Sequence, residues 1–485
     1  MASRVADVEA FAADALQSGL TDLYLLGMGG SCLCAEVFRD VPMARRPGGN
    51  LTVLDTTDER AVQAVTTNLV PERSLFIVAS KSGSTIEVSS LERHFWSVMS
   101  AALPTSAGRH FVAITDPDTA LNARAGRLGY RQTFLNPADI GGRFSALSLF
   151  GLVPAALLGL DVRALLASGG RIAEQCRTEG DNPGLALGTF MGKQAASGRD
   201  KLTLLLPPAL EPLGVWIEQL VAESTGKNGR GVLPVVGEPA GLATEYGRDR
   251  AFVIVTSADG TDAAATGNSL EAAGHPVFRI TTTAAELGGE FLRWEVATAV
   301  AGAVLGVNPF DEPNVKDAKQ RTQRQLDTFT ARGMFHVAPP LAKVGGRGRR
   351  EHRGAAPAGG RYVAILDYVS ADATRGATID RGRRELRQRT GLASTYGVGP
   401  RYLHSTGQYH KGGPNTGMFL LITATDATTT PVPGEPYSFR TLKEAQALGD
   451  FEALVAAGRT VIHYHLDDPA ADFDAAIEAA LGEIH

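Results

Sequence analysis

Short apolar segments alternate with helical patterns in the N-terminal third of the chain, and this alternation constrains the fold more than any other feature. The candidate strands are Leu23–Gly29, Leu51–Asp55, Leu75–Ser80, Phe111–Asp116 and Tyr130–Asn136. Strands separated by helices predict a parallel sheet with helices on both faces. Ligands bind such sheets at the carboxyl ends of the strands, so functional residues are expected in the loops that follow the strands.

A second alternating block starts near Lys201 and ends with a long helix that reaches Val307, and a third α/β block begins at His336. The sequence therefore predicts three domains, at residues 1–165, 166–335 and 336–485. The expected fold class is α/β, with two doubly wound parallel-sheet domains and a C-terminal α/β segment.

A Gly/Arg-rich tract, Val344–Arg361, opens the third block and has the composition of a flexible basic loop. An RNA-binding tract is the alternative, but the interleaved aromatic residues that such tracts use are absent from it. The whole chain carries 47 Lys and Arg against 52 Asp and Glu, a net charge of −5. This balance argues against a protein that coats nucleic acid or an anionic membrane.

The longest uncharged stretch, from Phe144 to Leu160, contains Pro154 and falls short of the ~20 residues that a membrane span needs. It predicts a buried core helix. Three cysteines in 485 residues do not make a disulfide framework, which fits a reducing compartment. The N-terminal segment lacks the apolar core of a signal peptide. We therefore expect a cytoplasmic protein with neither nucleic acid nor membrane as a partner.

The motif Gly27-Met28-Gly29-Gly30-Ser31 follows the first strand and opens a helix. A dinucleotide fingerprint would need glycine where Cys32 stands, which argues against an NAD-dependent dehydrogenase. A tight glycine turn still lets a small ligand approach backbone N–H groups and a hydroxyl. Gly29, Gly30 and Ser31 are therefore candidate substrate-binding residues.

The motif SKSGST, at residues 80–85, ends an apolar strand and precedes a helical pattern. Hydroxyls and N–H groups at a helix N-terminus predict a phosphate cradle that needs neither a metal nor a Walker lysine. An ordinary N-capping turn is the alternative. The candidate phosphate ligands are Ser80, Ser82, Ser84 and Thr85. We find no converging His, Asp and Glu spacing, so no metal and no cofactor are expected.

A helix that starts near Leu213 carries an apolar stripe, and Glu223 continues this stripe three residues after Leu220. Glu223 also lies near the C-terminus of the helix, where the helix dipole disfavours a carboxylate and raises its pKa. The residues alone fit either a general base or a surface glutamate in a fraying turn. Glu218 lies off the stripe and is expected to face solvent.

Five segments occur in an order that resembles the phosphoglucose isomerase family, which is built from two sugar-isomerase (SIS) domains. They are GMGGS, SKSGST, GGRFSALSLFGLVPAALLGLD (Gly141–Asp161), VAESTGKNGRGVLPV and NPFDEPNV. The later HSTGQYHKGGPNTG segment is similar to the isomerase half of transaldolase–phosphoglucose isomerase fusions. The resemblance implies cofactor-independent interconversion of glucose 6-phosphate and fructose 6-phosphate through an enediolate.

The resemblance also implies roles for four residues. Glu223 matches the base in the ESTGK segment, and Arg143 in GGRFS matches the arginine that faces the enediolate, a role that suits a permanent charge. Lys319, after NPFDEPNV, matches a lysine that assists ring opening, with Lys316 as a near competitor. His404, in LHSTGQ, matches the ring-opening histidine, which in this family can come from a neighbouring subunit.

The position of this histidine departs from the family pattern, since no matching histidine follows soon after Glu223. We therefore expect a rearranged order of segments, in which the third block delivers His404 to the site. His410 and Lys411 are further candidate ligands there. The alternative is that His404 is a loop histidine without a partner.

Two other functions stay open at this point. One is a dual phosphoglucose/phosphomannose isomerase, and the other is a non-catalytic SIS module that senses sugar phosphates. The expected small-molecule partner is a hexose 6-phosphate. A second copy of the chain and a transaldolase domain, fused or in a separate chain, are candidate protein partners.

Overall fold

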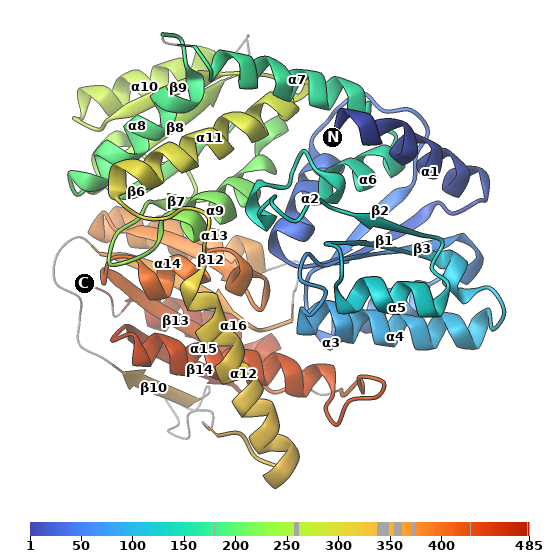
Figure 1. Cartoon of the computed structure of the whole chain (residues 1–485). Helices are drawn as coiled ribbons and strands as arrows, with labels where there is room; N and C mark the ends of the chain where they lie inside the picture. Colours follow the sequence, from blue (N-terminus) through green and yellow to red (C-terminus); the bar gives the residue numbers. More distant parts are fainter. Residues whose placement is uncertain are drawn as a thin grey trace.

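The computed structural model describes residues 1–178, 180–256, 261–336, 349–353, 361–370, 375–426, 428–482 and 484. Three sheets follow one another along the chain, and helices cover them (Figure 1). With one exception, all neighbouring strands within each sheet are parallel. The predicted α/β class with parallel sheets is therefore confirmed.

The first sheet has the strand order β2-β1-β3-β4-β5. Its strands are β1 (Asp22–Gly27), β2 (Asn50–Leu54), β3 (Ser74–Ala79), β4 (Phe111–Thr115) and β5 (Gln132–Leu135). One face packs against α1 (Val5–Gln17), α2 (Leu33–Asp40) and α6 (Leu149–Leu157), and the other against α3 (Glu59–Asn68), α4 (Ile86–Ala102) and α5 (Ala120–Leu128) (Figure 1). The five strands predicted from the sequence are confirmed. Every residue of α6 is buried, which confirms the predicted core helix.

The second sheet has the strand order β7-β6-β8-β9. Its strands are β6 (Lys201–Leu205), β7 (Leu233–Val235), β8 (Arg250–Thr256) and β9 (Val277–Thr281). The helices around it are α7 (Val162–Gln175), α8 (Pro183–Ala196), α9 (Leu213–Thr225), α10 (Thr261–Ala272) and α11 (Leu287–Leu305). One apolar cluster runs from α1, α2 and α6 through α9 and α11 to this sheet, so the first two sheets share a core.

The third sheet has the strand order β10-β14-β13-β11-β12. Its strands are β10 (Arg349–Arg353), β11 (Tyr362–Asp367), β12 (Ala393–Val398), β13 (Gly417–Ala424) and β14 (Thr460–Leu466). The helices of this region are α13 (Arg375–Thr390), α14 (Gly407–Gly412), α15 (Phe439–Ala456) and α16 (Pro469–Gly482), and α12 (Pro313–Arg332) lies against α15 (Figure 1). We call the described residues from 349 onward the third unit.

All three sheets place their first parallel strand between the second and the third, so the third unit repeats the topology of the first two. The exception is β10, which pairs antiparallel with β14 at the sheet edge. This strand comes from the Gly/Arg-rich tract, so the expectation of a loop is wrong for residues 349–353. A strand can form there because β14 offers a free edge. Residues 344–348 and 354–360 of the tract lie outside the described residues.

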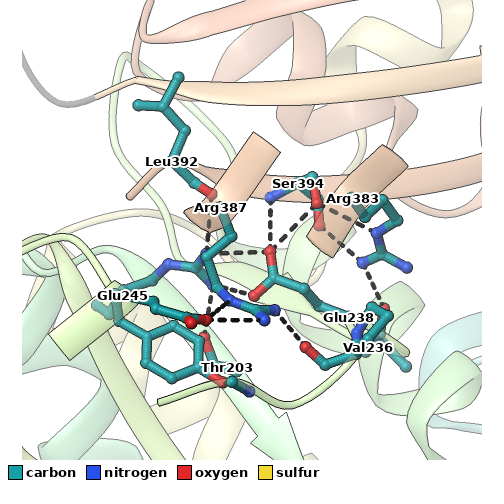
Figure 2. A network of polar contacts seen from close by, with 12 residues as sticks. Thr203, Val236, Glu238, Glu245, Arg383, Arg387, Leu392 and Ser394 are labelled. Carbon is teal, nitrogen blue, oxygen red and sulfur yellow. Dashed lines mark hydrogen bonds and ion pairs between the residues drawn. The ribbon is translucent and has the colours of Figure 1, made fainter. Parts of the chain in front are cut away.

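A buried network of charged side chains joins the second sheet to the third unit (Figure 2). Arg250 of β8 forms an ion pair with Glu238 at 3.0 Å, and their side chains are 0% and 1% exposed. Glu238 also accepts from the backbone N and hydroxyl of Ser394, both at 3.1 Å. Arg383 donates to the Val236 carbonyl at 3.0 Å. The third unit is therefore fixed to the second sheet by hydrogen bonds to and from buried, paired charges.

Among the helices that the structure describes, none is both long enough and apolar enough to cross a bilayer.

Candidate active site

The glycine motif after β1 forms η2 (Gly29–Ser31) and brings three other segments into contact. Gly29 has a φ of +52°, and a Cβ there would lie 2.5 Å from Nε2 of Gln219 and 2.7 Å from the carbonyl oxygen of His404. A Cβ on Gly30 would overlap the carbonyl of Gly142, next to η5 (Gly142–Phe144). The motif therefore lies where α9, η5 and the third unit meet, and only glycine permits so close an approach.

The SKSGST segment connects β3 to the N-terminus of α4, where the strand–helix pattern places it. The hydroxyls of Ser80 and Thr85 lie 3.1 Å apart, as do those of Ser82 and Ser84. Ser80 is buried, whereas Ser82 and Ser84 are exposed. Thr85 is the N-cap residue but does not cap α4 with its own side chain. Ser84 lines one cavity together with Glu87, whereas Ser80 and Thr85 line a second cavity, so the phosphate cradle stays a prediction.

Glu223 lies on the last turn of α9 and is only 6% exposed. Its Oε2 accepts from Nε2 of Gln219 at 3.0 Å, and its Oε1 lies 3.4 Å from Nη1 of Arg143. Burial raises the pKa of Glu223, and the attraction of the Arg143 guanidinium offsets this only in part. A buried carboxylate with a raised pKa is suited to taking up and returning a proton.

Arg143 is 6% exposed and contacts two segments at once. Besides Glu223, its guanidinium pairs with Glu312 at 3.0 Å and donates to the carbonyls of Pro309 and Asp311, both at 3.1 Å. The structure thus brings the Arg143 guanidinium beside the Glu223 carboxylate. It also gives Arg143 a structural task, since these contacts hold the NPFDEP segment against α9.

His404 comes from η9 (Arg401–His404) of the third unit. Its Nε2 lies 2.9 Å from Oε1 of Glu87, and its carbonyl oxygen accepts from Nε2 of Gln219 at 2.7 Å. Because the same Gln219 amide contacts Glu223, one side chain bridges the candidate base and the candidate ring-opening histidine. The third unit therefore delivers His404 to this place, as the expected rearrangement of segments requires.

Contacts to both preceding sheets hold η9 in position. Arg401 pairs with Glu36 at 2.6 Å and with Asp55 at 3.1 Å, and Ser405 donates to Glu218 at 3.2 Å. The expectation that Glu218 faces solvent is wrong, since its carboxylate faces the third unit. Burial raises the pKa of Glu218 to about 7. A single apolar stripe could not reveal this, because α9 has neighbours on more than one side.

A cavity of about 160 Å³ lies between the first sheet, α12 and the third unit. Its lining residues include Ser84, Glu87, Lys319, His404 and Gln446. Three of the predicted site residues, from separate parts of the chain, therefore face one space. Glu223 and Arg143 do not line this cavity, but Gln219 links Glu223 to the backbone carbonyl of His404, which does line it. The competitor Lys316 has a side chain outside the described part of the structure.

The expectation that His410 and Lys411 are ligands of this site is wrong. His410 is 2% exposed and lies among aromatic rings of the third unit, with the Phe419 centroid 5.1 Å away. Lys411 pairs with the buried Asp450 at 2.6 Å. Both side chains turn into the third unit, because α14 is short and buried on all sides.

Three residues that the sequence did not single out belong to the site: Glu87, Gln219 and Gln446. Burial by itself would raise the pKa of Glu87, but the facing His404 ring and its hydrogen bond bring that pKa below the usual value. Glu87 thus stays ionised beside the imidazole. Their distance in sequence from predicted site residues could have identified two of these three residues. Glu87 lies in the first helical turn after SKSGST, and Gln219 lies one helical turn before Glu223.

Within the residues that the structure describes, no group of three or more His, Cys, Asp or Glu side chains is arranged to hold a metal ion.

Comparison with known proteins adds an independent line of support. The family model for phosphoglucose isomerase matches residues 10–232. The glucose-6-phosphate isomerase of Rubrobacter xylanophilus is 31% identical over 362 residues, which cover 64% of this chain and 83% of that protein. The chain belongs to the phosphoglucose isomerase family. A further family relative, the glucose-6-phosphate isomerase of Heliobacterium modesticaldum, is 29% identical over 64% of this chain and 81% of its own length.

Two solved structures are similar to this member of the phosphoglucose isomerase family. A hypothetical protein from Thermus thermophilus superposes with a TM-score of 0.61 at 25% identity, over 66% of this chain and 87% of that one. The glucose-6-phosphate isomerase of Chlamydia trachomatis has a TM-score of 0.58 at 18% identity, over 68% and 74% respectively. The match of the phosphoglucose isomerase model contains Arg143 and Glu223 but stops before Lys319 and His404.

Proposed function

We propose that this chain is a glucose-6-phosphate isomerase, which interconverts glucose 6-phosphate and fructose 6-phosphate. Membership of the phosphoglucose isomerase family supports this activity. One observation carries the proposal: Gln219 bridges the buried Glu223 to His404, and His404 lines a cavity together with Lys319 and Ser84. Aldose–ketose isomerisation uses a carboxylate base, a histidine and a cation, and here the base lies next to the cavity that His404 and Lys319 line.

In this proposal the substrate is held by its phosphate. The phosphate ligands are the hydroxyls of Ser80, Ser82, Ser84 and Thr85 together with first-turn N–H groups of α4. Gly29, Gly30 and Ser31 approach the sugar through their backbone and hydroxyl. These groups bind the dianion at a helix N-terminus, so the sugar end of the substrate extends toward the third unit.

Ring opening breaks the bond between C1 and the ring oxygen and moves one proton from the C1 hydroxyl to that oxygen. We assign the transfer to His404, and the Lys319 ammonium stabilises negative charge on the oxygens involved. Glu87 accepts the hydrogen bond from Nε2 of His404, which leaves Nδ1 as the nitrogen that exchanges a proton with the substrate.

Isomerisation then moves a proton between two carbons. Glu223 takes the proton from C2 of the open aldose and returns it to C1, while the proton of the C2 hydroxyl passes to the C1 carbonyl oxygen, so that C2 becomes the ketone and C1 a hydroxymethyl group. The enediolate that forms between the two steps carries negative charge, which the nearby Arg143 guanidinium stabilises. The raised pKa of Glu223 makes it a stronger base than an exposed glutamate.

Three finer proposals accompany the activity. We propose that the protein works in the cytoplasm, in keeping with its low cysteine content. A homodimer and an association with a transaldolase domain rest on the family resemblance. Light scattering after size-exclusion chromatography, with and without an added transaldolase, tests both associations: a mass of one chain in both runs would contradict them.

A coupled assay of fructose 6-phosphate conversion, with chelator and no added metal, tests the activity. We expect steady formation of glucose 6-phosphate. Mannose 6-phosphate is run in parallel, since comparable rates on both aldoses would identify a dual isomerase instead. Binding of fructose 6-phosphate without turnover would identify a sensing module and would overturn the proposal.

A further inference from the structure

Gln446 of α15 lies between the first sheet and the third unit, inside the candidate active site. It is 2% exposed and lines the same cavity as His404 and Lys319. Its Nε2 donates to Oε1 of Glu87 at 2.7 Å, and its Oε1 accepts from the Thr57 hydroxyl at 2.8 Å. Both hydrogen bonds connect residues that are more than 350 positions apart, at separations of 359 and 389.

The orientation of this amide follows from its partners. The ionised carboxylate of Glu87 only accepts hydrogen bonds, so the NH2 group of Gln446 must face it. The carbonyl of Gln446 then faces Thr57, whose hydroxyl donates. The same Oε1 of Glu87 also lies 2.9 Å from Nε2 of His404. Two donors therefore converge on one carboxylate oxygen, and one of them is fixed at its other end by Thr57.

A buried ion pair anchors the helix that presents Gln446. Lys443, three residues earlier on α15, pairs with Asp58 and with Asp426, both at 2.7 Å. Asp58 adjoins Thr57 and also accepts from the Ser370 hydroxyl at 2.5 Å. The side chain of Lys443 is 5% exposed, so this contact is screened little by solvent. One turn of α15 is thus fixed to residues 57 and 58 at two points.

We propose that Gln446 is a positioning residue, which holds the Glu87 carboxylate against His404 and so lets the third unit set the geometry of ring opening. This inference rests on the proposed function. Without the amide, the Glu87 carboxylate can rotate away from the imidazole, and His404 loses its fixed tautomer. A hydrogen bond to a charged group is worth enough to change a rate by about 10- to 100-fold.

The alternative is that Gln446 only fills space between α15 and the first sheet. A double-mutant cycle separates the two, because a residue that acts through Glu87 has no effect once Glu87 is replaced. We expect Gln446→Leu to lower kcat on fructose 6-phosphate by about 10- to 100-fold with a smaller change in KM. In a Glu87→Gln background the same substitution should change kcat by less than about twofold. Equal losses in both backgrounds would overturn the proposal.

Two further variants complete the experiment. Thr57→Val removes the hydroxyl that orients the amide, and we expect a smaller loss of kcat in the same direction. Gln325→Leu is the matched control, since Gln325 is a fully buried glutamine on α12 that faces Glu452 of α15 at 3.4 Å. We expect it to leave kcat unchanged. A loss of kcat in this control as large as that in Gln446→Leu would contradict a specific role for Gln446.

A readout without turnover distinguishes this proposal from the proposed function. The ring-nitrogen signals of His404, which report its tautomer, are measured by NMR in the four proteins of the cycle. We expect Gln446→Leu to change the proportion of the two His404 tautomers when Glu87 is present and to leave it unchanged with Glu87→Gln. No change in either background would overturn the positioning role. If the variants show the expected changes but the wild-type protein does not convert hexose 6-phosphates, the proposed function alone is overturned.

Discussion

Removal of the Glu238 carboxylate should weaken the attachment of the third unit to the second sheet. Glu238→Gln keeps the size of the side chain and an oxygen that can accept from Ser394, but it leaves Arg250 buried without an opposite charge at 3.0 Å. Arg250 would keep only neutral partners, the Thr203 hydroxyl at 2.9 Å and the Leu392 carbonyl at 3.1 Å. Breaking a buried ion pair in this way costs about 3–5 kcal/mol of unfolding free energy.

Urea unfolding followed by circular dichroism measures this cost. The control is Glu271→Gln, which breaks the exposed pair with Arg279 and should leave the midpoint unchanged. Because the third unit carries His404, isomerase activity should be lost at the urea concentration where the mutant unfolds. A loss below about 1 kcal/mol for Glu238→Gln would refute the reasoning that this network holds the unit in place.

The same network predicts a pH dependence. The pKa of Glu238 is lowered in the folded protein: burial alone would raise it, but the Arg250 guanidinium and its hydrogen bond outweigh that effect. The stabilisation is therefore fully present above the unfolded pKa of about 4.3 and is lost as the pH falls through the lower folded pKa. The unfolding free energy of the wild-type protein should fall as the pH drops below the unfolded pKa of about 4.3. The Glu238→Gln variant should show a smaller fall.

Three other predictions address the site. The pH midpoint of the acidic limb of the kcat/KM profile should lie above the ordinary glutamate pKa of about 4.3, because burial raises the pKa of the base Glu223. A midpoint at or below that value would contradict the assignment of Glu223 as the base. Gly29→Ala should lower kcat at least about 10-fold, because its Cβ would meet the Gln219 amide and the His404 carbonyl; wild-type kcat would contradict the close approach. A mixture of the inactive Glu223→Gln and His404→Ala proteins, unfolded and refolded together, should stay inactive, since one chain holds both residues; restored turnover would show that His404 acts across a subunit boundary.

Much of the fold follows from local patterns in the sequence. Strands β3 and β4 are mostly apolar, are buried along their whole length and are bounded by polar turns, so both are found within one residue of their predicted ends. The resemblance of LHSTGQ to a family motif, rather than a local pattern, singled out His404. The helix α15 was missed, although Ser438 caps it by accepting from the backbone N of Thr441.

The contacts that complete the site could not be read from sequence patterns. The pairing of Glu87 with Gln446 spans 359 positions, and no periodicity of one helix specifies a partner that far away. His410 and Lys411 closely follow the LHSTGQ motif in the sequence, but their side chains are buried in the third unit. Successive residues of a helix face different directions, so closeness to the motif does not place a side chain in the site. Glu218 was misplaced because its partner belongs to the third unit, whose position no local pattern fixes.

The central claim is that Glu223 moves the proton in a hexose 6-phosphate isomerase. The direct test compares the turnover of fructose 6-phosphate by wild-type protein and by Glu223→Gln, together with the affinity of each for the substrate. Glu312 remains beside Arg143 in the variant at 3.0 Å, so the arginine keeps a charged partner. The account predicts a loss of kcat of about 100- to 10,000-fold with substrate binding retained. Turnover within a few-fold of wild type would contradict it.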